Sequence, residues 1–327
     1  MAADGKQAAE VASAVEVLRR GGLVALPTET VYGLAANAED ELAVRRIFAA
    51  KGRPQSHPLI VHVADAAAAS GFAAELSGDA ARLARELWPG PLTMVVRRGP
   101  RALDVVTGGQ DTVALRVPAH PLALEVLRSF GGGLAAPSAN RFGRTSPTTA
   151  QHVRDDLGGA VDLVLDGGPC SVGVESTIVD LSAGAPAILR PGGLPREEIE
   201  RVLGRPVPVR TGGEVRAPGT LLSHYAPRAG VVLAPPDEVA SRAGELASRG
   251  ARVAAVAPRQ ALPEGVDLLE VPADAAALAQ VLYSRLREGD AAGYEVLVVQ
   301  VPAEGGLGLA VRDRLRRAAA PRGARGT

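Results

Sequence analysis

Lys51 and Arg53 stand one residue apart, in the run KGRP at 51–54, and both side chains could bind phosphate. Only two of the 36 basic residues are lysines, the other being Lys6. An ammonium is a compact point charge and a guanidinium is a flat fork, a combination that suits a polyphosphate. Cations are also favoured at helix C-termini, so a solvated helix end is the alternative interpretation.

Arg116 and His62 each interrupt an apolar run, VALRV at 113–117 and LIVHV at 59–63. A buried guanidinium needs a partner, because an unpaired charge in an apolar environment is very costly. For Arg116 that partner is either a protein carboxylate or the carboxylate of a substrate. His62 is either a core residue or a site residue. No cluster of Cys, His and Asp with metal-ligand spacing surrounds it, so we expect no zinc site.

Ser138 and Asn140 follow a strand of small residues, and open α/β sheets bind ligands beyond such strand ends. Ser146 precedes Pro147, the favoured first residue of a helix, so Ser146 is predicted to cap a helix whose free N–H groups could bind an anion. Ser176 and Arg190 also stand at strand ends. Since no Walker A or kinase signature occurs, a nucleotide would be held by scattered side chains.

The elements that position these residues alternate between strands and helices, which indicates an α/β sheet. Their irregular spacing favours a mixed sheet over a parallel one. Strands are predicted at 23–26, 59–63, 92–96, 113–117, 134–136, 163–165, 177–181 and 187–190. Helices are predicted at 7–20, from Asp40 to 51, at 79–87, from Ser146 onward and at 197–203. Thr28, Thr30 and Tyr32 alternate, so an extended segment would place them on one face.

A second domain follows the first. Residues 1–205 form the first domain, and 206–228 form a linker rich in Pro and Gly without periodicity. Residues 229–320 then resume the alternation, which predicts a small Rossmann-like α/β domain, with 321–327 as a tail. Its strands are predicted at 231–233, 253–257, 268–271 and 296–301, and its helices at 238–248, 275–287 and 307–319. It has no G-x-G-x-x-G run, so we do not expect it to bind a dinucleotide.

The composition restricts the class of protein. Of 327 residues, 46% are hydrophobic, which is typical of a globular chain. Aromatic residues make up 3%, and 36 acidic residues balance 36 basic ones, so direct nucleic-acid binding is expected to be weak or absent. The single cysteine, Cys170, fits a reducing compartment. No apolar run approaches the roughly 20 residues of a membrane span, and we expect a cytoplasmic protein.

The motifs together resemble those of a known family. They are PTETVYGL at 27–34, KGRP at 51–54, PLIVH at 58–62, WPGPLT at 88–93, PSAN at 137–140 and GVEST at 173–177. Residues 8–205 resemble the YrdC/Sua5 family of threonylcarbamoyl-AMP synthases. The run SHYAP at 223–227 and the second domain make the chain similar to the long, two-domain Sua5 form. The resemblance implies a YrdC-like mixed, twisted sheet.

The resemblance also implies a nucleotidyltransferase reaction. L-threonine, bicarbonate or CO₂ and ATP would give L-threonylcarbamoyladenylate and pyrophosphate, with Mg²⁺ accompanying ATP. A partner transferase complex would then move the threonylcarbamoyl group to adenosine 37 of tRNA, forming t6A. We see no dedicated carboxylate cage for Mg²⁺ in the sequence, so the phosphates are expected to supply most of its ligands.

Site residues carry over from the family one by one. The catalytic group would lie around the ATP phosphates and consist of Lys51, Arg53, Ser138 and Asn140. Further contacts to ATP would come from His57, Thr112, Ser146, Arg190 and His224. Threonine would be held by Thr30, His62, Arg116 and Ser176. Catalysis would consist mainly of positioning, with cations offsetting the charge of the transferring phosphate.

Two positions depart from the family pattern. Many relatives have Asn where this chain has His57, so a phosphate contact there would become sensitive to pH. Some relatives have a further aromatic residue near Leu222. The linker is too polar for a core and too long for a simple connection, and we hypothesise that it acts as a lid over the site.

Two other functions are weighed against the synthase. Related domains occur in hydrogenase-maturation carbamoyltransferases, but those carry Cys-based zinc fingers that a single cysteine excludes. The second alternative is a module that binds double-stranded RNA or assists ribosome assembly. The zero net charge and the few aromatic residues count against it.

Overall fold

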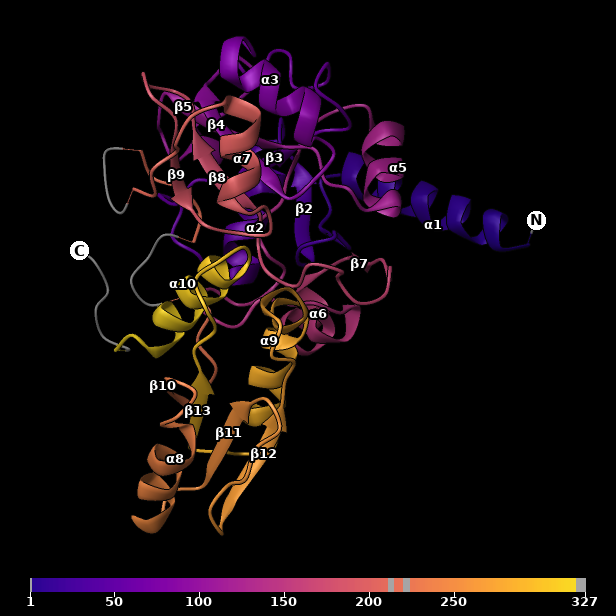
Figure 1. Cartoon of the computed structure of the whole chain (residues 1–327). Helices are drawn as coiled ribbons and strands as arrows, with labels where there is room; N and C mark the ends of the chain where they lie inside the picture. Colours follow the sequence, from indigo (N-terminus) through magenta and orange to yellow (C-terminus); the bar gives the residue numbers. More distant parts are fainter. Residues whose placement is uncertain (1, 211–214, 220–223, 322–327) are drawn as a thin grey trace. The chain divides into compact units, whose positions relative to one another are not determined.

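The computed structural model describes residues 2–210, 215–219 and 224–321 (Figure 1). Contacts between residues divide the chain into two compact units. The first consists of Met1–Phe142, Pro147–Ser171 and Glu175–Thr220, and the second of Gly143–Ser146, Val172–Val174 and Leu221–Thr327. Within the described ranges, no helix is long and apolar enough to span a bilayer.

The first unit is built on one sheet with the strand order β7-β1-β2-β6-β3-β5-β4-β8-β9. The strands are β1 Val24–Leu26, β2 Gly33–Asn37, β3 Ile60–His62, β4 Leu92–Arg97, β5 Thr112–Arg116, β6 Leu134–Ala135, β7 Leu163–Val164, β8 Thr177–Asp180 and β9 Ala187–Arg190. The pairs β1/β7, β3/β5 and β4/β8 are parallel, whereas β1/β2, β4/β5 and β8/β9 are antiparallel. The prediction of a mixed sheet is confirmed.

The helices of this unit largely follow the prediction. They are α1 Ala2–Arg19, α2 Glu41–Lys51, α3 Gly78–Leu87, α4 Asp104–Thr107, α5 Pro121–Phe130, α6 Ala150–Leu157, the 3₁₀ turn η1 Gly158–Ala160 and α7 Arg196–Leu203. The sequence analysis does not predict α4, α5 or β2. The residues of β2 are GLAAN, which lack the β-branched and aromatic side chains that mark a strand.

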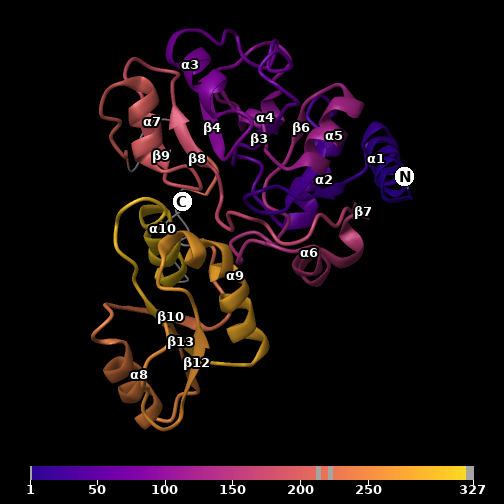
Figure 2. The same cartoon turned by 45° about the vertical axis from the view of Figure 1, so that its right-hand side comes forward.

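One face of the sheet is covered by α2, α3, α6 and α7. Their apolar side chains share a core with Val61 of β3, Leu115 of β5 and Met94 of β4. On the opposite face α1 and α5 lie side by side, as Figures 1 and 2 both show, and they pack against β1, β2 and β6 through residues such as Leu18 and Leu127. These two helices cover only the β1 side of that face.

The rest of the second face carries both an apolar cluster and polar side chains. Ile60, Val95, Ala114 and Ile178 pack there with Leu189 and Ala217, and among the described residues no helix joins this cluster. Alternate residues of a strand share a face, so His62 lies on the side of Ile60 and Arg116 on the side of Ala114. The half of the face without a helix is therefore where the candidate chemistry gathers.

The second unit is a small parallel α/β domain, as predicted. Its elements are β10 Gly230–Ala234, α8 Val239–Ser248, β11 Val253–Ala257, β12 Val266–Glu270, α9 Ala275–Ala291, β13 Val296–Gln300 and α10 Gly308–Ala319. The strand order is β10-β13-β11-β12, and every pair is parallel. Strands buried between helices read as apolar runs, such as VAAVA in β11.

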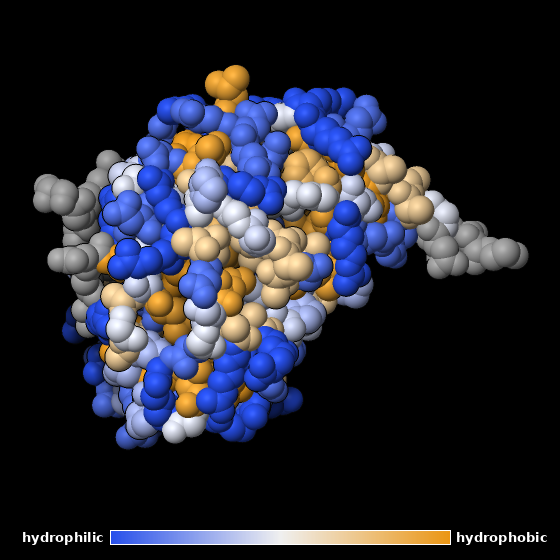
Figure 3. Space-filling view, turned by 90° about the horizontal axis from the view of Figure 1, so that it is seen from above, coloured by the Kyte–Doolittle hydropathy of each residue, from blue (hydrophilic) through white to orange (hydrophobic). Residues whose placement is uncertain are grey.

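One face of the protein carries both hydrophilic and hydrophobic residues (Figure 3). Figure 3 shows hydrophobic residues on one face in small patches separated by hydrophilic ones. Within the described part of the chain, Leu42 is the one large hydrophobic side chain that is exposed, at 76%.

Helix α2 ends at Lys51, so its stability bears on the position of that site residue. Its N-cap, Asp40, accepts from the N–H groups of Leu42 at 3.0 Å and Ala43 at 3.1 Å. We expect Asp40→Ala to lower the free energy of unfolding by about 1 kcal/mol, measured by urea denaturation. Ser77 precedes α3 without a side-chain cap bond, so Ser77→Ala is the matched control and should cost less than about 0.5 kcal/mol. Equal losses in the two variants would contradict the assignment.

Candidate active site

The strand register brings predicted site residues together on the face without a helix. β3 and β5 are paired so that His62 lies opposite Arg116. β4 and β5 place Met94 opposite Leu115, which brings Thr93 opposite Arg116. Three polar side chains on adjacent strands thus form one row across the sheet.

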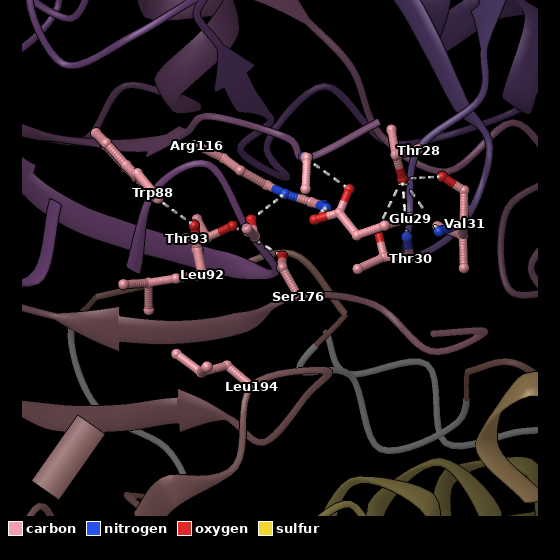
Figure 4. Close-up of polar contacts among 12 residues, drawn as sticks. Thr28, Glu29, Thr30, Val31, Trp88, Leu92, Thr93, Arg116, Ser176 and Leu194 are labelled. Carbon is pink, nitrogen blue, oxygen red and sulfur yellow. Dashed lines mark hydrogen bonds and ion pairs between the residues drawn. The ribbon is translucent and has the colours of Figure 1, made fainter. Parts of the chain in front are cut away.

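Arg116 is held by an ion pair with Glu29. Its Nη2 donates to Oε1 of Glu29 at 2.7 Å, and its Nε donates to the carbonyl of Gly90 at 3.3 Å. Oε2 of Glu29 accepts from the N–H of Ala119 at 3.0 Å. Figure 4 shows Glu29, Thr30 and Ser176 around the guanidinium. The sequence analysis left a protein carboxylate or a substrate carboxylate open, and the structure shows that one partner is Glu29.

One nitrogen of Arg116 remains available. Arg116 is 4% exposed and Glu29 is 8% exposed, so the pair is buried. No described residue accepts a hydrogen bond from Nη1 of Arg116, and this atom is not among the buried polar atoms that lack a partner. Nη1 is therefore reachable from outside the protein, and an anion could bind there without displacing Glu29.

The loop that carries Glu29 is a turn, and the prediction of an extended segment through Thr28, Thr30 and Tyr32 is wrong. Oγ1 of Thr28 donates to the carbonyl of Val31 at 2.6 Å and accepts from the N–H groups of Thr30 and Val31 at 3.2 Å. Such a side-chain bond competes with strand pairing. Since Thr28 has given its one hydroxyl proton to Val31, the contact at 2.8 Å must be donated by Thr30. The hydroxyl of Thr30, a residue that is fully buried, thus has only lone pairs left for a further hydrogen bond.

His62 is a neutral acceptor. Its Nδ1 lies 3.3 Å from the carbonyl oxygen of Ile60, which can only accept, so Nδ1 carries the proton and Nε2 keeps its lone pair. Burial, and then the charge of Arg116, lower the pKa of His62 to about 3. The imidazole is therefore uncharged near neutral pH. Arg116, Thr30 and His62 together present one cationic donor and two neutral acceptors, which match the carboxylate, ammonium and hydroxyl of a small amino acid.

Ser176 extends this group toward β9. Its Oγ lies 2.8 Å from Oγ1 of Thr93 and accepts from Nη2 of Arg190 at 3.1 Å. Arg190 also donates to the carbonyl of Ser176 at 2.8 Å and to that of Pro218 at 3.0 Å. Arg190 thus fixes Ser176, and its predicted contact with ATP stays a prediction.

Lys51 anchors the loop that contains Ser138 and Asn140. Its Nζ donates to the carbonyls of both residues, and Oδ1 of Asn140 lies 3.3 Å away. Lys51 is 3% exposed, and burial, followed by the charge of Arg53, lowers its pKa well below the usual value. Three oxygen acceptors nevertheless require three N–H donors, so we assign the ammonium form. The phosphate contact from the sequence analysis stays a prediction, and the structure shows that this lysine holds the loop.

Arg53 and His57 both contact Phe142, a residue that the sequence analysis missed. Arg53 donates to the carbonyl of Pro58 at 2.9 Å, and its guanidinium carbon lies 5.5 Å from the centre of the Phe142 ring. The His57 ring meets the same ring edge-on at 5.4 Å. Burial, and then the charges of Arg53 and Arg216, lower the pKa of His57. A phenylalanine directly after the PSANR run, in a chain with four, was an available signal.

Three parts of the predicted linker 206–228 are described, and two of them, residues 206–210 and 215–219, belong to the first unit. Val215 and Ala217 join the apolar cluster on the face that carries the site. Arg216 donates to the carbonyl of Gly108 at 2.7 Å. Thr112 begins β5, four residues before Arg116 and on the same face. Residues 224–228 belong to the second unit. Residues 211–214 and 220–223, including Leu222, lie outside the described residues, and the lid stays a hypothesis.

Ser146 and His224 belong to the second unit, so the structure does not place them against the other predicted ATP residues. Ser146 is fully buried, but it does not cap a helix as predicted. Helix α6 begins at Ala150, and its cap is Thr149, whose hydroxyl accepts from the N–H of His152 at 3.2 Å. The predicted anion site at a helix beginning after Ser146 is therefore wrong.

Two further groups bear on the chemistry. No cluster of three or more His, Cys, Asp or Glu that could hold a metal ion occurs in the described part of the chain. Burial raises the pKa of the Cys170 thiol to about 12, with a smaller contribution from Glu29. A protonated, buried thiol is a weak nucleophile, which agrees with a structural role.

Family models match both parts of the chain. The Sua5_yciO_yrdC model, described as "Telomere recombination", matches residues 16–192, which is more than half of the chain. The chain belongs to the Sua5/YrdC family. A second model, described as the C-terminal domain of threonylcarbamoyl-AMP synthase, matches residues 194–320. The family resemblance predicted from the motifs is confirmed.

Similar proteins extend over nearly the whole chain. A threonylcarbamoyl-AMP synthase of Pyrococcus abyssi is 44% identical over 312 residues, which cover 92% of this chain and 91% of the relative. One from Bacillus subtilis is 39% identical over 325 residues, with 96% and 94% covered. The crystal structure of P. abyssi Sua5 complexed with L-threonine matches with a TM-score of 0.90 and 41% identity, covering 94% of each chain. The family domain therefore has the predicted YrdC-like fold.

The neutral state of His62 can be tested through stability. The pKa of His62 is 6.5 in the unfolded chain and about 3 in the folded chain, so between these pH values the imidazole is protonated only in the unfolded chain. The contribution of His62 is thus complete above pH 6.5, and we expect it to fall by about 1.4 kcal/mol per pH unit as the pH drops below that value. Urea denaturation of His62→Gln and the parent protein at pH 7, 6 and 5 measures the difference. Parallel pH dependence in the two proteins would contradict the assignment.

The two lysines offer a matched pair of substitutions. Lys51→Met leaves the carbonyls of Ser138 and Asn140 without their donor, and we expect a loss of about 1–3 kcal/mol in the free energy of unfolding. Lys6 is 80% exposed, so Lys6→Met should change stability by less than about 0.5 kcal/mol. Urea denaturation at pH 7 decides, and equal stability of the two variants would refute the anchoring role of Lys51.

Proposed function

We propose that the protein makes L-threonylcarbamoyladenylate from L-threonine, bicarbonate and ATP. The observation that supports this most is the pairing of Arg116 with His62, in a chain that matches a threonine-bound relative over 94% of its length. The threonine ammonium and bicarbonate combine to a carbamate, a water and a proton. A carbamate oxygen then bonds to the α-phosphorus of ATP, and the bond to the β-phosphate oxygen breaks to release pyrophosphate.

The row on β3 and β5 supports a threonine site. The threonine carboxylate accepts from Nη1 of Arg116, the nitrogen that no described protein group occupies. Oγ1 of Thr30 and Nε2 of His62 accept from the ammonium and the hydroxyl. Ser176, fixed by Arg190, closes the group on the side of β8.

The segment 137–140 and the end of α2 support an ATP site. Lys51 holds this segment through Ser138 and Asn140, and Arg53 lies buried beside it. Fixed cations in a buried place stabilise the charge that develops on a transferring phosphate at little cost in reorganisation. When Mg²⁺ is bound with ATP, it neutralises the leaving pyrophosphate, and the phosphates carry most of its ligands. Thr112, His57 and Arg190 complete the proposed ATP contacts on this unit.

The product has a consequence for partners. A threonylcarbamoyladenylate is a mixed anhydride, which is reactive toward water. A transferase that carries the group to adenosine 37 of tRNA must therefore take it up promptly. Cys170 is the single cysteine, which supports a reducing, cytoplasmic location.

Pyrophosphate release from ATP with single amino acids tests this function. We expect release with threonine and bicarbonate together, and little release when either is left out. Serine lacks one methyl group, which is worth about 1–3 kcal/mol, so its kcat/KM should be roughly tenfold to a hundredfold lower. Mass spectrometry of the product should show threonylcarbamoyl-AMP. Release that does not depend on threonine, or tight RNA binding without release, would refute the proposal.

A further inference from the structure

Glu29 occupies a position that substrate binding alone does not explain. Its carboxylate lies 2.7 Å from Nη2 of Arg116, the residue that takes the substrate carboxylate under the proposed function. A second carboxylate beside the same guanidinium competes for its charge, and it brings a full negative charge into a buried site. Burying an ion pair removes two charges from water, and this cost can exceed the attraction between them. Stability alone therefore does not account for Glu29, and we look for its role in binding or specificity.

The position of Glu29 is fixed from both sides. Its Oε2 accepts from the backbone N–H of Ala119, and the turn that carries it is closed by the hydroxyl of Thr28. The Nε of Arg116 is in turn held by the carbonyl of Gly90. The guanidinium therefore cannot rotate freely, and Nη1 is the nitrogen that has no hydrogen-bond partner among the described residues.

The net charge of the pair selects the charge of the ligand. Arg116 and Glu29 together are neutral, so a zwitterion enters without adding net charge to a buried place. A carboxylate without an ammonium group would bring one uncompensated negative charge, which is costly where water is excluded. His62 and Thr30 offer only neutral lone pairs, so they do not compensate for that charge.

We propose that Glu29 is a positioning residue that restricts the amino-acid site to zwitterions. It orients the Arg116 fork, and its charge cancels the attraction that Arg116 alone would have for any carboxylate. This inference rests on the proposed function only for the identity of threonine. The binding preference itself can be measured without turnover.

The probes are L-threonine and 3-hydroxybutyrate, which is threonine with its α-ammonium replaced by hydrogen. Calorimetry gives the dissociation constant of each for the parent protein, Glu29→Gln and Glu29→Asp. In Glu29→Gln the site carries a net positive charge, and we expect the preference for threonine to fall by about tenfold or more. Glu29→Asp keeps the charge, so it should retain the preference while binding threonine more weakly. The pyrophosphate assay should show a raised KM for threonine in Glu29→Gln with little change in kcat.

The control is Asp180→Asn, which also removes a buried carboxylate that pairs with an arginine. Asp180 lies at the end of β8 and should leave the preference unchanged. An unaltered preference in a folded Glu29→Gln overturns the inference, and so does a Glu29→Asp that loses the preference. If Glu29→Gln fails to melt cooperatively, Glu29→Asp decides alone. A parent protein that releases no threonine-dependent pyrophosphate refutes the proposed function, whereas the calorimetric preference still tests Glu29.

Discussion

Buried cations are the constraint around which the first unit is organised. Lys51, Arg53, Arg116 and Arg190 are each less than a tenth exposed, and a buried charge needs oxygen atoms around it. Backbone carbonyls fill much of this need, at Ser138 and Asn140 for Lys51 and at Ser176 for Arg190. A carbonyl satisfies a donor without cancelling its charge. The site thus keeps a positive potential that a polyphosphate can use.

The sheet provides the space for these cations because its second face is only half covered. α1 and α5 pack over β1, β2 and β6, while the half over β3, β5 and β4 carries the short apolar cluster and the polar row. Residues on adjacent strands are held in register by backbone hydrogen bonds, which keeps His62 and Arg116 opposite each other although, among the described residues, no helix packs on their own face. Residues 215–219 supply the cover that a helix provides elsewhere.

The sequence was informative where the signal is local. The cap at Asp40 and the strand spans of the second unit follow from propensity, periodicity and capping rules. Contacts between distant residues were not predictable in this way. Glu29 and Arg116 are 87 residues apart, as are Lys51 and Ser138, and nothing in either segment reveals the other. The predicted cap at Ser146 is wrong because Ser146 and Thr149 both satisfy the rule for a helix cap, and the helix begins after Thr149.

The proposed threonine subsite, with Arg116 and Glu29, is neutral, whereas the proposed ATP subsite, with Lys51 and Arg53, is positive. This difference in charge favours movement of the carbamate toward ATP in the proposed reaction. Threonine arrives as a zwitterion at the neutral pair of Arg116 and Glu29. Carboxylation converts its ammonium to a carbamate, so the bound molecule becomes a dianion that the neutral pair no longer matches. The neighbouring cations Lys51 and Arg53 then attract the new charge toward the α-phosphate. A single change of charge thus weakens the hold of the first subsite and strengthens that of the second, at the step where the carbamate must meet ATP.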